Sequence, residues 1–195
     1  MHLYSLTLNA DLSGLGLLPR NFQGLIGILT APLLHADFSH LISNTFPLLV
    51  SGWVIFFFYR KISYILFIFI YLVTGILVWL FAREVYHIGA SGIVYGFVSF
   101  LFFSGIFRKD NKSIALSLII TFLYGGMVWG ILPGMKGISW ESHLFGAFTG
   151  LISAYLFRKI DPPKNKYEWE DEPDDFNVDD LEVSYDPEKN KFNKL

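Results

Sequence analysis

The chain has 195 residues, of which 53% are hydrophobic and 18% aromatic while only 16% are charged, a composition far from that of an ordinary soluble domain. Residues 1–159 carry ten basic and five acidic residues, whereas residues 160–195 carry five basic and twelve acidic residues, and the small scattered basic clusters give no support for nucleic-acid binding. Because the chain contains no Cys, a disulfide framework, a thiol nucleophile and a thiolate metal site are excluded.

Residues 1–37 are expected to form an N-terminal segment and loop at the outer membrane surface. The apolar run 24–34 is too short to cross a bilayer as a helix, and Pro32 interrupts it. No run of spanning length therefore precedes residue 38.

Five uncharged runs follow, and most reach the roughly 20 residues that a helix needs to cross a bilayer. They cover residues 38–59, 62–82, 88–107, 113–132 and 142–157, and Pro133 stops the fourth. A soluble protein with a buried core is the alternative, but five such runs leave too little polar surface to enclose them. The sequence therefore predicts an all-α membrane protein, with five transmembrane helices in a domain spanning residues 38–159.

The charges between the predicted helices indicate an orientation. Basic residues are more numerous after the first, third and fifth helices, where they are Arg60, Lys61, Arg108, Lys109, Lys112, Arg158 and Lys159, than on the opposite side, where they are Arg20, Arg83 and Lys136. The positive-inside rule places the larger set in the cytoplasm. Ser91 and His143 then lie near the outer ends of their helices, at similar depth on one side of the membrane.

The C-terminal tail, residues 160–195, has a composition unlike the rest of the chain. It contains Pro162-Pro163, an acidic run from Glu168 to Asp175 and few aliphatic residues. Such a composition is typical of disordered segments. We expect an acidic cytoplasmic tail that is disordered or has only weak local structure.

Polar side chains begin the first predicted helix. His40 and Asn44 are four residues apart and therefore share one helix face. Both can donate hydrogen bonds near the outer membrane surface, where polar side chains indicate function. The alternative is that they bond to neighbouring helices as packing contacts.

The third predicted helix begins with Gly89-Ala90-Ser91-Gly92, and Tyr95 follows one turn after Ser91. The small neighbours leave the Ser91 hydroxyl open to a substrate, and the unpaired N–H groups of a helix start can stabilise an oxyanion. The alternative is an N-capping serine in a small-residue packing motif.

His143 opens the fifth predicted helix and shares a stripe with Gly146 and Gly150, a spacing that favours close helix packing. If the partner helix is the one that begins at Ser91, the imidazole can reach the serine hydroxyl and act as its base. Glu141 is two residues from His143 and points away from it in a helix. A Ser–His dyad is therefore favoured over a triad, with Tyr95 packing on the imidazole.

A zinc site is the rival chemistry, with His35, Asp37, His40 and His143 as its candidate ligands. The chain has no His-Glu-x-x-His motif, and His35 and His40 are five residues apart, which suits joint ligation from one helix poorly. We therefore expect neither a metal nor a cofactor.

Three motifs together resemble the rhomboid family of intramembrane serine proteases. They are His35-x-x-x-x-His40-x-x-x-Asn44, Gly89-x-Ser91-Gly92 with Tyr95, and His143-x-x-Gly146-x-x-x-Gly150, and the resemblance covers residues 24–159. The family fold is a six-helix bundle around a water-filled cavity open to the outer side. The helix that precedes the His-x-x-x-x-His helix in the family has no counterpart of spanning length here.

The resemblance implies a role for each matched residue. Ser91 is expected to be the nucleophile and His143 the general base and acid, while His40, Asn44 and the Ser91 N–H form the oxyanion hole. It also implies that Tyr95 packs on the imidazole, that Gly146 and Gly150 contact the serine helix, and that His35 anchors a loop.

The function expected from this resemblance is hydrolysis of peptide bonds in or near transmembrane segments of membrane-protein substrates. The expected location is a bacterial inner membrane, with the C-terminus in the cytoplasm and the site open to the outer side. Two alternatives remain: an inactive rhomboid-like protein that binds membrane-protein clients, and a small transporter whose polar cavity carries a solute.

Overall fold

The computed structural model describes residues 13–134, 137–160 and 183–194. The chain divides into two compact units, Met1–Pro162 and Pro163–Leu195. Within its described residues the first unit is helical, apart from one isolated bridge between Leu17 and His87. It contains all the residues of the candidate site.

Five main helices form the first unit. They are α3 (Phe38–Phe58), α4 (Ser63–Phe81), α5 (Ser91–Arg108), α6 (Asn111–Tyr124) and α7 (Trp140–Leu156). The 3-10 segment η4 (Gly125–Ile131) continues α6, and α3, α4, α5 and the combined span Asn111–Ile131 are long and apolar enough to cross a membrane. The fifth predicted span is the 17-residue helix α7. All five agree with the predicted runs to within three residues, and the all-helical membrane bundle is confirmed.

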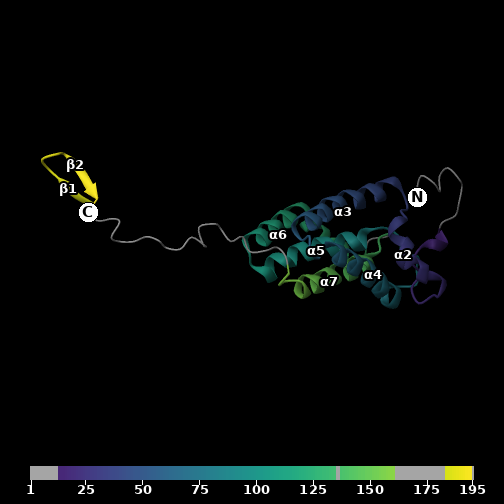
Figure 1. Ribbon diagram of the computed structural model, residues 1–195. Coiled ribbons are helices and arrows are strands. Elements are labelled where there is room, and N and C mark those ends of the chain that lie inside the picture. Colours follow the sequence, from purple (N-terminus) through teal and green to yellow (C-terminus); the bar gives the residue numbers. More distant parts are fainter. Residues whose placement is uncertain (1–12, 135–136, 161–182, 195) are drawn as a thin grey trace. The chain divides into compact units, whose positions relative to one another are not determined.

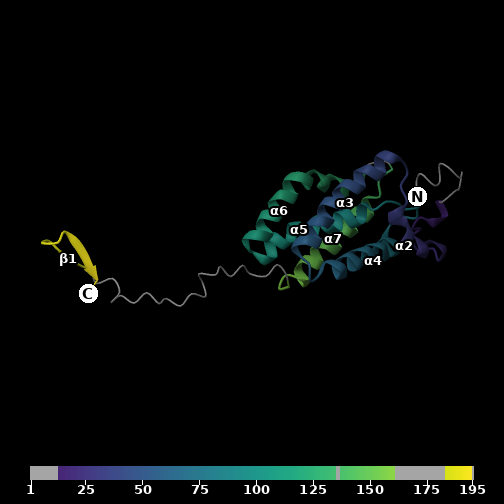
Figure 2. The ribbon, with the colours of Figure 1, turned by 45° about the horizontal axis from the view of Figure 1, so that its top comes forward.

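Helix α5 lies at the centre of the bundle. It contacts each of α3, α4, α6 and α7, and Figures 1 and 2 show it between α3 and α6 on one side and α4 and α7 on the other. In the apolar stretch of α5, 67% of the residues are buried inside the protein, compared with 17–22% in the other three spans. Most residues of α3, α4 and the span Asn111–Ile131 therefore face the surroundings, while α5 is enclosed.

Small residues allow the closest contact in the bundle, between α5 and α7. A Cβ atom on Gly146 would overlap the carbonyl oxygen of Gly92, and one on Gly150 would overlap that of Gly96. Lipid chains are as apolar as the side chains they surround, so helices in a membrane associate through such close packing rather than through the hydrophobic effect. The glycines bring the two backbones into contact.

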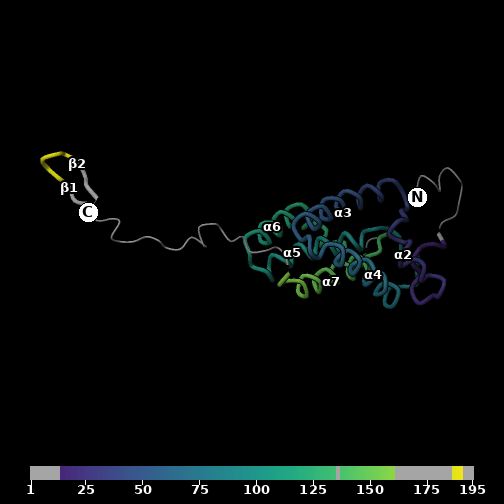
Figure 3. Tube along the Cα trace, in the orientation of Figure 1, coloured from purple at the N-terminus to yellow at the C-terminus, as the bar shows by residue number. Residues whose placement is uncertain are grey.

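The segment that precedes α3 consists of short helical turns: η1 (Ser13–Leu15), η2 (Gln23–Ile26), α2 (Gly27–Thr30) and η3 (Ala31–Leu33). No helix of spanning length lies between residues 13 and 37 of the described chain. The tube in Figure 3 follows this segment along the C-terminal end of α4.

Specific contacts fix this N-terminal segment to the bundle. Leu17 exchanges two backbone hydrogen bonds with His87, of 3.0 and 2.8 Å. The Arg20 guanidinium donates to the Ala82 carbonyl at 2.6 Å, beyond the end of α4, and the Trp79 indole donates to the Asn21 carbonyl at 3.0 Å. The segment is thus packed onto the loop that leads to Ser91.

The second unit contains a hairpin of β1 (Val183–Asp186) and β2 (Lys191–Lys194), with Asp186 opposite Lys191. The Asp186 carboxylate accepts hydrogen bonds from the amides of Glu188 and Lys189, at 3.0 and 3.3 Å, and Asn190 adopts a left-handed conformation. These features are typical of a side-chain-stabilised turn. This short hairpin lies in the tail for which disorder or weak local structure was expected, and residues 161–182 of that tail fall outside the described chain.

Candidate active site

A cavity of about 790 Å³ opens beside the N-terminal ends of α5 and α7. Its walls come from α3, the loop between α4 and α5, the first turn of α5, η4 and the loop before α7. The sequence-predicted residues that line it are His40, Asn44, Ser91, Tyr95 and His143. Three separate motifs therefore meet at one cavity.

Ser91 is the first residue of α5 and is 8% exposed. The N-cap residue Ala90 supplies no side-chain hydrogen bond. The Ile93 N–H donates to the Ala90 carbonyl at 3.0 Å, but the N–H groups of Ser91 and Gly92 have neither an intrahelical acceptor nor a side-chain cap among the described residues. The Ser91 hydroxyl makes no hydrogen bond to another described residue. Gly89, two residues earlier, has a φ of +103°, which a residue with a side chain rarely adopts. This conformation turns the chain sharply into α5.

The His143 imidazole lies in the first turn of α7, stacked on Tyr95. The ring centroids are 4.1 Å apart and the planes are inclined by 11°. His143 Nδ1 lies 2.9 Å from the Gly130 carbonyl oxygen, and the Tyr95 hydroxyl donates to the Met127 carbonyl at 2.7 Å. A carbonyl only accepts, so Nδ1 carries the proton and Nε2 holds the free lone pair.

His40 and Asn44 reach the cavity from the start of α3. This helix is capped by Asp37, whose carboxylate accepts from the His40 amide at 2.7 Å. A Cβ atom on Gly89 would lie 2.8 Å from His40 Nε2 and 3.4 Å from Asn44 Nδ2, so both side chains pack against the turn before Ser91. The Asn44 amide nitrogen is buried and has no partner among the described residues.

His35 lies outside this cluster. Its ring meets that of His40 edge-on, with the centroids 5.1 Å apart. The carboxylate of Asp37 is engaged in capping α3. Among the residues that the structure describes, no group of three or more histidine or acidic side chains is arranged to hold a metal ion.

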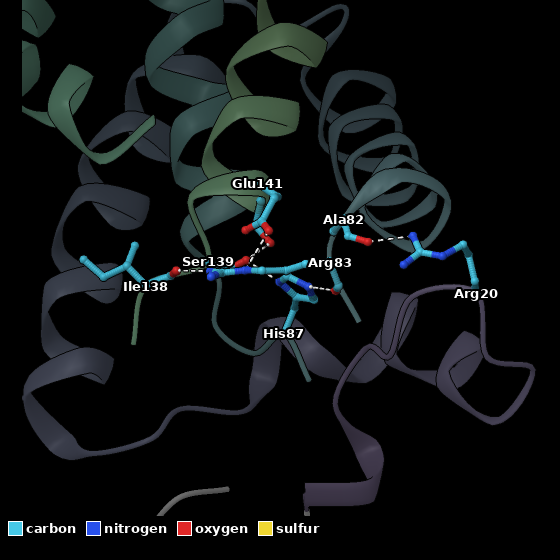
Figure 4. Close-up of polar contacts among 8 residues, drawn as sticks. Arg20, Ala82, Arg83, His87, Ile138, Ser139 and Glu141 are labelled. Atoms are coloured by element: carbon cyan, nitrogen blue, oxygen red, sulfur yellow. Dashed lines mark hydrogen bonds and ion pairs between the residues drawn. The ribbon is translucent and has the colours of Figure 1, made fainter. Parts of the chain in front are cut away.

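A charged pair that sequence reasoning did not assign to the site, Arg83 and Glu141, is shown in Figure 4, and Arg83 also lines the cavity. Arg83, in the loop before α5, pairs with Glu141 at 2.7 Å and donates to the Ile138 carbonyl at 2.8 Å. The Glu141 side chain is only 4% exposed, compared with 50% for Arg83. The pair joins the loop that precedes Ser91 to the first turn of the helix that carries His143.

His87 extends this connection. Its Nε2 lies 3.1 Å from the Arg83 carbonyl, its Nδ1 lies 2.5 Å from the Ser139 hydroxyl, and that hydroxyl is 2.6 Å from Ser142. Burial lowers the pKa of His87 below its ordinary value of 6.5, because the charged form loses hydration. In the sequence the available signal was a histidine four residues before Ser91.

Comparison with known proteins identifies the family of this chain. The Rhomboid domain family matches residues 23–160. An uncharacterized protein of Mycobacterium tuberculosis is 36% identical over 157 residues, which is 72% of this chain and 62% of the relative. An uncharacterized protein of Mycobacterium leprae is 35% identical over 141 residues, covering 67% of this chain and 55% of the relative. The chain thus spans about 60% of the length of these mycobacterial relatives.

A more distant relative from Acanthamoeba polyphaga mimivirus also carries a rhomboid name. It is 26% identical over 157 residues, which is 71% of this chain and 81% of the relative. No solved structure matches the chain significantly. The family match covers most of the chain and includes all three motifs around the cavity, and the chain therefore belongs to the rhomboid family and is a multi-pass membrane protein.

Proposed function

We propose that this rhomboid is an intramembrane serine endopeptidase that uses Ser91 as nucleophile and His143 as general base. The observation that carries the proposal is the convergence of Ser91, His143, His40 and Asn44 on one cavity at the ends of two helices in backbone contact. A nucleophile, a base and a set of donors are the equipment that acyl transfer requires.

The first step is attack on a peptide carbonyl of the substrate. His143 Nε2 accepts the Ser91 proton while the serine Oγ bonds to the carbonyl carbon. Tightening of the serine–histidine contact when substrate binds is common in enzymes of this kind. The imidazolium then gives its proton to the leaving amide nitrogen, the C–N bond breaks, and an acyl-enzyme remains.

The second step is hydrolysis of that ester. Water gives a proton to His143 and attacks the acyl carbon, and the Ser91–acyl bond breaks as the proton returns to the serine. The oxyanion in both steps is stabilised by His40, by Asn44 and by the Ser91 N–H. The unpartnered Asn44 amide supports this role, and an oxyanion donor is worth roughly 10²–10³ in rate.

The substrates proposed are transmembrane segments of other membrane proteins. A regular helix shields its peptide bonds and already uses their hydrogen-bonding groups, so segments with helix-breaking residues are favoured. We place the enzyme in a bacterial inner membrane, with its C-terminus in the cytoplasm and the cavity open to the outer side. The unequal distribution of basic residues supports this orientation.

The test is cleavage of a model transmembrane substrate by purified protein in liposomes. Ser91→Ala and His143→Ala are each expected to abolish cleavage. A fluorophosphonate probe is expected to label the unmodified chain at Ser91, to leave Ser91→Ala unlabelled, and to react slowly with His143→Ala because the base is missing.

Other outcomes would identify the alternatives. Binding of a membrane-protein client without cleavage or labelling would indicate an inactive rhomboid-like protein. Solute flux through liposomes without labelling would indicate a transporter. Cleavage that persists in the Ser91→Ala variant would rule out the proposed nucleophile.

A further inference from the structure

The 3-10 segment η4 contacts the stacked pair Tyr95 and His143 through its backbone. The Met127 carbonyl accepts from the Tyr95 hydroxyl at 2.7 Å, and the Gly130 carbonyl lies 2.9 Å from His143 Nδ1. No residue of η4 is buried, so these two contacts are its polar attachments to the centre of the site.

The local sequence leaves the Gly130 carbonyl available. In a 3-10 helix this oxygen would accept from the amide of residue 133, but that residue is Pro133 and has no N–H. The chain leaves the helix at Leu132, which is extended with a ψ of 140°, as expected for a residue before proline. The oxygen that His143 contacts is therefore a helix-end carbonyl without a backbone donor of its own.

Only glycine fits at position 130. A Cβ atom there would overlap the Tyr95 hydroxyl and would lie 3.1 Å from His143 Nδ1. The backbone of Gly130 is not left-handed, so its requirement is steric rather than conformational. A side chain would separate η4 from the imidazole.

We propose that the Gly130 carbonyl is the orienting partner of His143, in the position that an aspartate holds in Ser-His-Asp triads. It keeps the proton on Nδ1, so that Nε2 is free to act as base toward Ser91. Glu141, the nearest acid in sequence, is committed to Arg83 instead. Gly130 is a positioning residue, and this inference rests on the proposed function.

The first measurement reads the contact without any activity. Protein labelled with ¹⁵N-histidine, in detergent micelles at a pH where the ring is neutral, reports by NMR which ring nitrogen carries the proton. His143→Ala identifies the signals. The Nδ1–H tautomer is expected in the unmodified chain, and finding the Nε2–H tautomer would overturn the inference.

The second measurement compares Gly130→Ala with Gly126→Ala, a matched control in the same 3-10 segment whose Cβ would meet nothing within 4 Å. Gly130→Ala is expected to mix the tautomers and to lower kcat about 10- to 100-fold with little change in KM, because transition-state geometry rather than substrate binding is lost. Gly126→Ala is expected to behave as the unmodified chain.

These outcomes separate the inference from the proposed function. A Gly130→Ala variant with unchanged tautomer and kcat would overturn the role of the carbonyl. If Ser91→Ala still cleaves substrate while His143 is the Nδ1–H tautomer, the contact stands and the proposed nucleophile fails. If Gly130→Ala does not fold, the tautomer of His143 in the unmodified chain still tests whether the Gly130 carbonyl accepts the Nδ1 proton.

Discussion

At the scale of single residues, the two side chains of the Arg83–Glu141 ion pair differ in their exposure to solvent. The carboxylate is 4% exposed, whereas half of the arginine side chain reaches the surface. Removing the partner of a buried charge is costly because the charge stays out of water, but a half-exposed charge regains hydration. The two halves of the pair should therefore respond differently to substitution.

We predict that Arg83→Gln lowers the free energy of unfolding by about 3 kcal/mol and Glu141→Gln by about 1 kcal/mol. Unfolding in mixed micelles with increasing SDS provides the measurement. Glu84→Gln is the control, because Glu84 is 74% exposed in its pair with Arg20, and such pairs contribute little. Equal losses from both halves of the buried pair would contradict the prediction.

The burial of His87 leads us to predict that the stability of the fold depends on pH. Burial is the main cause that lowers the pKa of His87, and the charge of Arg83 acts in the same direction, while the Arg83 carbonyl and Glu141 oppose it. Between the lowered pKa and the ordinary value of 6.5, the unfolded state binds a proton that the folded state does not. The free energy of unfolding therefore rises with pH in this window and levels off above it.

The expected result is a loss of stability as the pH falls from 7 to 5, of at most about 1.4 kcal/mol per pH unit from this residue. The same SDS unfolding series is measured at several pH values for the unmodified chain and for His87→Gln. The difference between the two slopes isolates His87 from the other histidines. Parallel slopes would show that His87 does not titrate differently in the two states.

At this scale the sequence indicates which side chains belong to the candidate site better than it indicates which groups they bond to. Ser91, His143 and Tyr95 are visible because polar groups are rare in apolar runs. The hydrogen-bond partner of His143 is the main-chain carbonyl of Gly130. Every residue has such a carbonyl, so a pattern of residue types cannot indicate which one is used. The pairing of Arg83 with Glu141 depends on two loops meeting in space, which spacing along the chain does not encode.

At the scale of elements, the contact between α5 and α7 depends on two glycines. We predict that Gly146→Ala and Gly150→Ala each destabilise the bundle by 3 kcal/mol or more, roughly the upper end for overpacking, since each new methyl group would meet a rigid backbone carbonyl. The measurement is the temperature at which the detergent-solubilised protein unfolds. His143 should also move away from Ser91, so fluorophosphonate labelling should slow.

The control is Gly52→Ala in α3. There a Cβ atom would meet only the Phe97 ring, at 3.5 Å, an ordinary contact. Alanine also favours the helix by roughly 1 kcal/mol relative to glycine. This variant should be as stable as the unmodified chain, and a comparable loss would show that any methyl group disturbs the bundle.

Helix positions are the part of the fold that composition predicts well. Bilayer-length apolar runs fix the spans because backbone groups inside lipid must be satisfied by the helix itself. The change from α6 to the 3-10 segment η4 at Gly125 was not predicted, because hydropathy does not distinguish α from 3-10 winding. Within this segment the Met127 and Gly130 carbonyls contact Tyr95 and His143, and such tertiary contacts are not encoded in hydropathy either.

At the scale of the whole molecule, the proposed orientation is open to a direct test. The chain has no Cys, so single cysteines can be introduced without removing others. We choose two exposed, uncharged positions, so that the charge distribution stays intact. They are Gln23→Cys in the N-terminal segment and Asn111→Cys at the start of α6.

We predict that a membrane-impermeant maleimide labels Gln23→Cys in intact cells and labels Asn111→Cys only after the membrane is permeabilised. The basis is the excess of basic residues on the side of Asn111. Both variants should react fully in detergent, which controls for local access. The reverse pattern would place the cavity on the cytoplasmic side.

The enclosure of α5 has a consequence for the kind of sequence it can carry. Its mean hydropathy is 1.4, compared with 2.5 for α4, and protein rather than lipid surrounds two thirds of it. A helix that faces lipid needs apolar residues on its surface because the lipid chains cannot hydrogen-bond to polar ones. A helix that faces other helices is constrained by packing and hydrogen bonding instead. In a random mutagenesis screen, α4 should therefore tolerate exchanges among large apolar residues and reject charges, while α5 should reject changes of size and keep its serines.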